Sequence, residues 1–423
     1  MGSYKRVSLL LFFILGLVKI NIHAQSALPM LYFNPSPRIN ALGMAGASLP
    51  TKDPFGFYYN PAQLGYFSQT NNLSYELYPS NINWFGLSSV TYRNSAVNIG
   101  YNFKNELNGL SLSAGFGYIH SEMNYGGVTI NPGGAPVYYA FPDDKFDAYS
   151  LGIGINYYVQ LDVGFTYKSI NPFLGNMAGG FGLQNNNVTL QPSAMDYGIL
   201  LTVPVLKLAA PDYEFNLFDG APASPYFNIS LGYSRLNQTS DVTYTDLPPI
   251  SGPLPRTVRL GYALSTGLDV EIHNNKFRLL GYDFTVDADQ ILIGPPDSTS
   301  TQGFLYKNGI GNISIGRNLI GLRSSDQVVV HKAHEFNLCE TFTVMIGRFD
   351  GAGYSNDESN GIGMRLKGIL TLLKAYTRDR TFNFIADHVD VQYYSSKINF
   401  GGPESKFESV NLHSIILAFD SLL

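Results

Sequence analysis

The residues from Leu110 to His120 alternate between two kinds of side chain. Apolar residues take one set of positions and small residues take the other, as in the run Leu-Ser-Leu-Ser-Ala-Gly-Phe-Gly-Tyr. A helix turns by about 100° per residue and would scatter the apolar side chains, whereas a strand collects them on one face. The segment therefore predicts a β-strand with one apolar face, and similar segments recur along most of the chain.

The recurring segments have about the length that a tilted strand needs to cross a bilayer. We count about 14 of them, joined alternately by short links and by long stretches rich in Gly, Pro, Asn and Asp. An even strand number with short turns at one end and long loops at the other is typical of bacterial outer-membrane barrels. The sequence predicts an all-β fold, a transmembrane antiparallel β-barrel over residues 71–423 with long extracellular loops.

The composition agrees with a lipid-facing wall. Charged residues make up 14% of the chain, against roughly 25% in typical soluble proteins, and aromatic residues also make up 14%. The formal net charge of -5 argues against nucleic acid as a partner, because nucleic-acid binding needs a concentrated basic patch. Cys339 is the only cysteine, so an intrachain disulfide is excluded.

The amino terminus has the pattern of an export signal. Lys5 and Arg6 precede an apolar run over residues 7–18, and a small residue, Ala24, stands before Gln25. The run is shorter than the roughly 17 to 25 residues of a transmembrane helix. We therefore predict a signal peptide over residues 1–24 and localisation in the outer membrane of a Gram-negative-type envelope, with lipid as a partner.

Residues 25–70 precede the first expected strand and are too rich in apolar residues, Gly and Pro for a disordered tail. The expected inward faces of the strands carry mostly Gly, Ser, Asn and Thr, which leaves a lumen that a folded segment can fill. We predict an N-terminal hatch or plug inside the barrel.

Two motifs lie in this segment, Pro-Arg-Ile-Asn-Ala-Leu-Gly-Met-Ala-Gly-Ala over residues 37–47 and Asp-Pro-Phe-Gly-Phe-Tyr-Tyr-Asn-Pro-Ala-Gln-Leu over residues 53–64. Together they resemble the N-terminal hatch of the PorV/PorQ group, which is itself similar to the FadL outer-membrane transporters. The resemblance covers roughly residues 26–70. The residues that carry it, with a structural or gating role, are Gly43, Met44, Gly46, Asp53, Asn60, Pro61 and Ala62. Glycine allows close backbone approach or a positive φ, and Asn60 can cap a turn before Pro61.

The resemblance implies two different functions. PorV-like members act in the type IX secretion system and handle secreted cargo proteins at the cell surface, whereas FadL-like members admit hydrophobic small molecules through the barrel wall. We expect a non-enzymatic component of protein secretion, with secreted cargo or other secretion components as partners. FadL-like uptake of hydrophobic compounds is the alternative. A secreted soluble β-rich binding module is a second alternative, because its strands would also alternate.

Further residues stand out in the expected strands. Pro204 cannot donate a ladder hydrogen bond and marks either a wall opening or a simple strand end. Charged residues share the inward registers of their segments, and unpaired charge inside a barrel is costly, so we expect them to pair across the lumen or with the hatch. These lumen charges are Arg259, Asp283, Asp287, Arg365 and Lys367.

Metal and enzyme chemistry is weakly indicated. His331, His334 and Glu335 lie close in sequence, but there is no His-Glu-x-x-His, no Cys cluster and no Gly-x-Ser-x-Gly elbow. Acidic residues in the expected loops do not have EF-hand spacing. We therefore expect no metal, no cofactor and no catalytic residue.

Overall fold

The computed structural model describes residues 28–80, 90–104, 109–126, 128–130, 138–140, 143–173, 192–211, 213–217, 220–238, 242–243, 251–272, 275–294, 304–401 and 409–420. The expected signal peptide over residues 1–24 lies outside these residues. No helix among them is long and apolar enough to cross a membrane.

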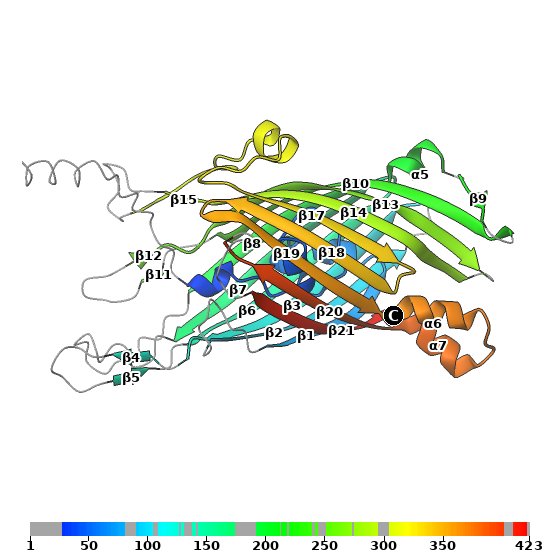
Figure 1. Ribbon diagram of the computed structural model, residues 1–423, viewed down its shortest axis with the longest axis horizontal. Coiled ribbons are helices and arrows are strands. Elements are labelled where there is room, and N and C mark those ends of the chain that lie inside the picture. Colours follow the sequence, from blue (N-terminus) through cyan, green and yellow to red (C-terminus); the bar gives the residue numbers. More distant parts are fainter. Residues whose placement is uncertain are drawn as a thin grey trace, which may run out of the picture.

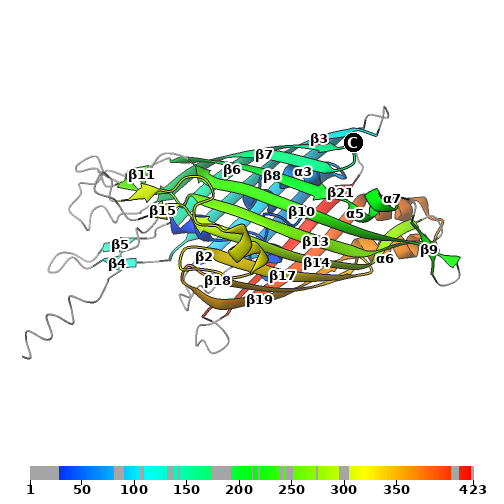
Figure 2. The ribbon, with the colours of Figure 1, turned by 90° about the horizontal axis from the view of Figure 1, so that it is seen from above.

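Fourteen antiparallel strands form a closed barrel (Figures 1 and 2). Each strand pairs with its neighbours along the chain, β21 pairs with β1, and β10 pairs with β13, so the wall has no free edge. The barrel strands are β1 Asn71–Ser80, β2 Thr91–Lys104, β3 Ser111–Asn124, β6 Asp143–Asn156, β7 Gln160–Phe173, β8 Ser193–Val203, β10 Pro222–Gln238, β13 Thr257–Ile272, β14 Asn275–Ile291, β17 Val329–Leu338, β18 Phe342–Gly351, β19 Tyr354–Arg365, β20 Val389–Asn399 and β21 Val410–Asp420. The expected fold class and the strand number are confirmed.

Shorter elements lie at the two ends of the barrel and inside it. One end, the turn end, carries the end of β21 and most of the tight turns, and the other, the loop end, carries the longer connections (Figure 1). The short strands are β4 Val128–Ile130, β5 Tyr138–Ala140, β9 Phe215–Asn216, β11 Val242–Thr243, β12 Ser251–Gly252, β15 Ile293–Gly294 and β16 Leu305–Tyr306. The helices are η1 Pro29–Tyr32, α2 Pro37–Ala41, η2 Gly56–Tyr58, α3 Gln63–Phe67, α5 Val205–Ala209, η4 Ile315–Ile320, α6 Leu366–Lys374 and α7 Arg380–His388.

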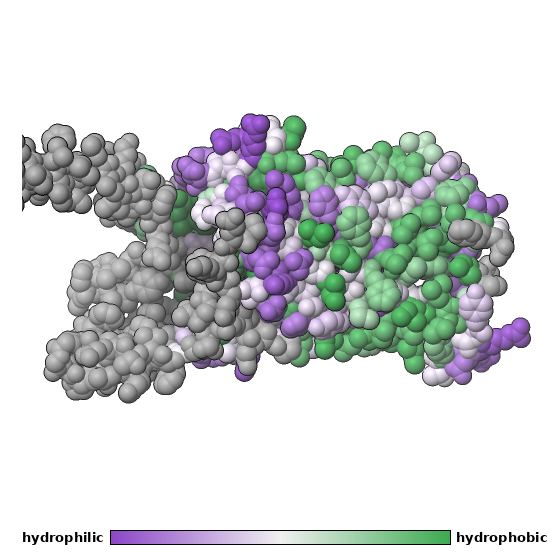
Figure 3. Space-filling model, viewed as in Figure 1, coloured by the Kyte–Doolittle hydropathy of each residue, from purple (hydrophilic) through white to green (hydrophobic). Residues whose placement is uncertain are grey.

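The outer face is apolar near the turn end and charged near the loop end. On β6 the outward residues Leu151, Ile153 and Ile155 are exposed, whereas Lys145 on the same strand forms ion pairs with Asp143 and Glu122. Figure 3 shows the same change, from a green belt to purple residues beside the grey loops. An exposed apolar belt of this kind is the lipid-facing surface of a transmembrane barrel. A soluble β-rich module would not expose it, so that alternative is wrong.

Candidate functional site

Residues 28–70, called here the lumen segment, lie inside the barrel. The segment forms hydrogen bonds with inward-facing groups of β2, β3, β8, β10, β14, β17 and β19. A segment outside a closed wall cannot contact strands on all its sides, so only the interior accounts for these bonds. Figure 2 shows the segment in blue behind the strands of the wall.

The two motifs fold the lumen segment onto itself. Ser36 caps α2 by accepting a hydrogen bond from Ile39 N at 3.0 Å, and Asp53 accepts one from Ser36 Oγ at 2.6 Å. Asn60 Oδ1 accepts a hydrogen bond from Ala62 N at 3.1 Å, which closes an Asx turn across Pro61. Ser36 thereby satisfies one of the backbone N–H groups that α2 leaves open, and Asn60 satisfies the N–H of Ala62 directly before α3.

Asn60 also joins the two motifs to each other and to the wall. Its Nδ2 donates to Ala47 O at 2.8 Å and to Ile199 O of β8 at 3.1 Å. Gly43 has a φ of 60°, and Met44 beside it has a φ of 64°. A Cβ on Gly43 would lie 2.8 Å from the backbone nitrogen of Arg348, so the turn meets β18 at a distance that only glycine permits. The Gly and Asn residues of the two motifs thus pack the segment against itself and against the wall.

The wall is built from small residues where the lumen segment touches it. A Cβ on Gly164 would lie 2.2 Å from the carbonyl carbon and oxygen of Pro61, a separation that no side chain can adopt. The wall glycines that meet the lumen segment in this way are Gly115, Gly117, Gly152, Gly154, Gly164, Gly198, Gly232, Gly347 and Gly361. They lie on seven strands, so the wall follows the contour of the segment around most of its circumference.

Near the loop end the interior is apolar rather than small and polar. Leu28, Met30 and Leu31 of the lumen segment belong to one buried cluster with inward side chains of the strands, among them Tyr92 and Phe146. The prediction that inward faces carry mostly small polar residues is therefore right for the turn-end half and wrong for the loop-end half. The reason is that apolar residues switch to the inward register where the outer face becomes charged.

One buried ion pair joins the lumen segment to the wall, and a second, within the wall, contacts the segment. Arg38 Nη2 lies 2.8 Å from Glu335 Oε2 and 2.9 Å from Glu335 Oε1, with 11% and 9% of the two side chains exposed. Lys168 of β7 lies 2.7 Å from Asp196 of β8, and its ammonium stands 4.7 Å from the centre of the Tyr58 ring. Sequence reasoning missed both pairs, because neither local spacing nor periodicity relates Arg38 to a residue 297 positions away.

The five expected lumen charges take different positions. Asp287 accepts hydrogen bonds from Ala47 N at 2.7 Å and from Ser48 Oγ, so it contacts the lumen segment. Arg259 lies 3.5 Å from Asp289 on the paired strand, with its guanidinium 5.2 Å from the centre of the Tyr59 ring. Asp283 forms no ion pair among the residues that the structure describes.

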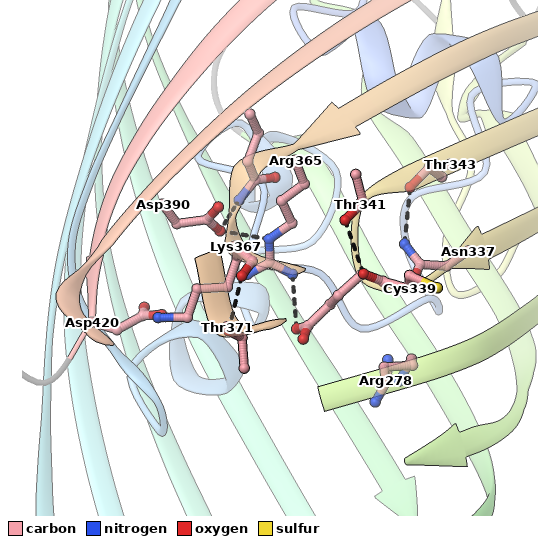
Figure 4. A network of polar contacts seen from close by, with 12 residues as sticks. Arg278, Asn337, Cys339, Thr341, Thr343, Arg365, Lys367, Thr371, Asp390 and Asp420 are labelled. Atoms are coloured by element: carbon pink, nitrogen blue, oxygen red, sulfur yellow. Dashed lines mark hydrogen bonds and ion pairs between the residues drawn. The ribbon is translucent and has the colours of Figure 1, made fainter. Parts of the chain in front are cut away.

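Arg365 and Lys367 lie at the turn end (Figure 4). Arg365 Nε is 2.5 Å from Asp390 Oδ2, and its Nη1 is 3.4 Å from Glu340. Lys367 Nζ is 3.6 Å from Asp420 Oδ2 and donates to Asp387 O at 2.6 Å. Lys367 does not continue an inward strand register, because β19 ends at Arg365 and α6 begins at Leu366.

Lys52 is the one base of the lumen segment whose pKa falls. Burial and, secondarily, the nearby Arg365 guanidinium lower the pKa of Lys52 from 10.5 to about 8. Both effects act against the charged form, because a desolvated ammonium loses hydration and a second cation repels it. The surroundings of Lys52 therefore disfavour its charged form.

Pro204 ends β8, which stops at Val203, and α5 begins at Val205. A pocket of about 400 Å³ opens at this point. It reaches from Tyr66 in the lumen segment to the exposed Tyr157 and Tyr158 on the turn between β6 and β7. Its lining residues are Tyr66, Asn156, Tyr157, Tyr158, Gln160, Thr202, Pro204, Lys207, Leu208, Pro211 and Asn228. The pocket joins the packed interior to the rim of the turn end.

The histidines considered for a metal point in different directions. His331 is buried and its Nδ1 lies 2.7 Å from Gly43 O, whereas His334 lies 2.8 Å from the hydroxyl of Tyr282 on the opposite face of the strand. Within the described ranges, no group of three or more His, Cys, Asp or Glu side chains is arranged to hold a metal ion.

No family model and no curated protein matches this chain. Among solved structures, the Ralstonia pickettii toluene transporter TbuX aligns over 92% of this chain and 97% of its own, with 10% identity and a TM-score of 0.35. The Pseudomonas putida toluene transporter TodX aligns over 90% and 96%, with 11% identity and a TM-score of 0.37. The CymD monoaromatic hydrocarbon channel aligns over 93% and 98%, with 12% identity and a TM-score of 0.34. Sequence identities and TM-scores this low assign no function to this chain. The barrel is established by the strand pairing described above.

Proposed function

We propose that this barrel admits hydrophobic small molecules across the outer membrane, with the lumen segment as the hatch that controls passage. The single observation that carries the proposal is the pocket of about 400 Å³ beside Pro204. Its volume lies within the roughly 300 to 1,000 Å³ of small-molecule sites. Aromatic, proline and leucine side chains form much of its lining, which suits an apolar solute.

The interior supports a route toward this pocket. An apolar solute that enters from the loop end meets the buried cluster around Met30, Tyr92 and Phe146. The lumen segment fills the space below, and its residue Tyr66 lines the pocket at the far side. Since the wall glycines leave no room beside the segment, passage requires the segment to shift. The proposal assigns the chain no catalytic step.

The test is to lock the lumen segment to the wall. Ser48 Oγ of the segment lies 3.1 Å from Thr285 Oγ1 of β14, so Ser48→Cys combined with Thr285→Cys places two thiols within disulfide reach. The variant is made in a Cys339→Ser background to remove the native thiol. Uptake of radiolabelled toluene and oleate is measured in cells that lack other outer-membrane routes for these compounds.

We expect uptake of at least one probe to depend on the protein, to fall when the disulfide forms and to return on reduction. The Cys339→Ser background alone is the control and is expected to respond to neither oxidant nor reductant. Uptake of both probes that is unchanged by deletion of the gene would refute the proposal. Uptake that depends on the protein but is unaffected by the lock would refute the hatch as the controlling element.

Protein secretion is the second candidate, in line with the resemblance to the PorV/PorQ group. The observation that favours it is the number of contacts that fix the lumen segment to seven strands, since a permanently filled barrel suits a docking component for cargo. Under this function, deletion of the gene causes surface proteins to accumulate in the periplasm, and the locked variant secretes normally. Intact secretion in the deletion strain would exclude it.

A further inference from the structure

A helical hairpin replaces the turn between β19 and β20. It consists of α6 (Leu366–Lys374) and α7 (Arg380–His388), which pack on each other at the turn end of the barrel (Figure 1). Asp379 caps α7 by accepting a hydrogen bond from Phe382 N at 2.7 Å, and Lys374 Nζ lies 2.5 Å from Asp387 Oδ1. The hairpin is thus an ordered element with its own internal contacts.

The hairpin is fixed to the barrel by several contacts, among them the ion pair of Lys367 with Asp420 and a close approach at Gly368. Gly368 of α6 is buried, and a Cβ there would lie 2.0 Å from Cys339 O in the turn between β17 and β18. The Arg365 guanidinium beside it is held by Asp390 and Glu340 (Figure 4). These contacts fix the direction in which α6 leaves the wall, so its exposed face has a defined orientation.

The exposed face of α6 is apolar throughout. Its most exposed side chains are Leu366, Ile369 and Leu373, followed just beyond the helix by Tyr376, of which 78% is exposed. Their spacing of three, four and three residues places them on one side of a helix. Phe384 and Ile385 of α7 are exposed as well. A patch of this kind on an ordered element indicates an interaction surface.

This patch continues the lipid-facing surface of the barrel. Ile362 and Met364 are the outward, exposed residues at the end of β19, and Leu366 follows them in the same two-residue register. The turn that Gly368 touches is flanked by Leu338 and Phe342, which are also exposed. The apolar belt therefore runs without interruption from the strands onto α6.

The charges of the hairpin suit a phospholipid surface. Residues 366–388 contain four basic residues, Lys367, Lys374, Arg378 and Arg380, and only two acidic ones, Asp379 and Asp387, although the whole chain has a net charge of -5. Arg378 and Arg380 are exposed between α6 and α7, at the tip of the hairpin. Basic groups that flank an apolar face are typical of helices that lie in a membrane interface.

We propose that the α6–α7 hairpin lies on the periplasmic leaflet of the outer membrane. The apolar face of α6, with Phe384 and Ile385 of α7, enters the boundary between headgroups and acyl chains, and the exposed Arg378 and Arg380 meet lipid phosphates. The hairpin thereby fixes the depth of the barrel in the bilayer. The inference depends on the barrel crossing a membrane and is independent of what the barrel transports.

The experiment places an indole on the hairpin and measures its contact with lipid. The chain has a single tryptophan, Trp84, so Trp84→Phe gives a background without indole fluorescence. Leu373→Trp is made in this background, with Tyr376→Trp as a second, more conservative variant. Ile320→Trp is the matched control, because Ile320 is at least as exposed as Leu373 but lies in η4 at the loop end. Each full-length protein is refolded into phosphatidylcholine and phosphatidylglycerol vesicles, and folding is verified by the change of gel mobility on boiling.

Replacement of the lipids by brominated analogues is expected to reduce the fluorescence of both hairpin variants more than about twofold. The Ile320→Trp variant is expected to change little. The result that overturns the proposal is quenching of the hairpin variants no stronger than that of the control in folded protein. Emission that is blue-shifted without quenching also overturns it, because the apolar face would then be covered by protein, such as a second copy of the chain.

Discussion

Replacement of Arg38 by methionine tests how the lumen segment is held. Arg38 belongs to α2 of the segment and forms two hydrogen bonds, of 2.8 and 2.9 Å, with the carboxylate of Glu335 in β17. Both side chains are nearly buried. Arg38→Met keeps most of the side-chain volume but leaves the Glu335 carboxylate without its cation inside the barrel.

The expected cost follows from this burial. Breaking a buried ion pair by removing one partner costs about 3 to 5 kcal/mol, because a desolvated charge is left unpaired. The pair of Arg348 and Glu358 has the same chemistry, but its side chains are 49% and 38% exposed, so its loss costs about 0 to 1 kcal/mol. Arg348→Met is therefore the matched control.

Hydrogen exchange of the folded protein in lipid nanodiscs measures the effect. Since about 1.4 kcal/mol corresponds to a factor of ten, the amides of residues 37–65 are expected to exchange on the order of a hundred to several thousand times faster in Arg38→Met. Exchange in the barrel strands and in the Arg348→Met variant is expected to change little. The double variant Arg38→Met with Glu335→Leu is expected to recover most of the protection. Equal exchange in Arg38→Met and Arg348→Met would refute the reasoning.

Three further predictions concern the same packing. The pKa of Lys52 is lowered to about 8, so its charged form destabilises the folded state below about pH 8 and this penalty disappears as the pH rises toward 10.5. Lys52→Met is accordingly expected to stabilise the folded lumen segment by at most about 3 kcal/mol at pH 7 and to have no such effect above pH 10.5. A difference in hydrogen exchange between the variant and the parent protein that does not change with pH would contradict this. Gly164→Ala is expected to expose residues 56–65 to limited proteolysis, because its Cβ meets the backbone of Pro61. Gly316→Ala, whose Cβ meets nothing within 4 Å, is expected to leave the proteolysis of these residues unchanged. Equal proteolysis of the two variants would count against a close-packed segment. Asp283 has no ion-pair partner within the described residues, and burial and the neighbouring Glu335 carboxylate act against its charged form, so Asp283→Ala is expected not to lower the temperature of heat modification, and a fall of several degrees would contradict this.

Much of the barrel could be predicted because its strands repeat one simple pattern. The outward residues of β3 and β6 near the turn end are apolar and the inward ones are small. A single sequence is enough to show this two-residue period. The strands are longer than expected, since their loop-end halves carry outward charges such as Lys145.

The parts that could not be predicted depend on contacts between residues far apart in the sequence, or on short segments that depart from the strand pattern. The position of Asn60 between Ala47 and β8, and the pairing of Arg38 with Glu335, follow from the closed barrel and not from spacing. The α6–α7 hairpin does not follow from the two-residue alternation that predicts the strands on either side of it. Its apolar residues recur every three or four positions, which is a helical period that could have been recognised.

The central claim, that the N-terminal segment occupies the interior of a closed barrel, is tested most directly by oxidation of the Ser48→Cys and Thr285→Cys variant in isolated outer membranes. In the Cys339→Ser background we predict an intramolecular disulfide in nearly all molecules, because the two native hydroxyl oxygens are 3.1 Å apart. Neither thiol is expected to react with a membrane-impermeant maleimide before oxidation. Two free thiols that both react with the maleimide and form no disulfide would contradict the account.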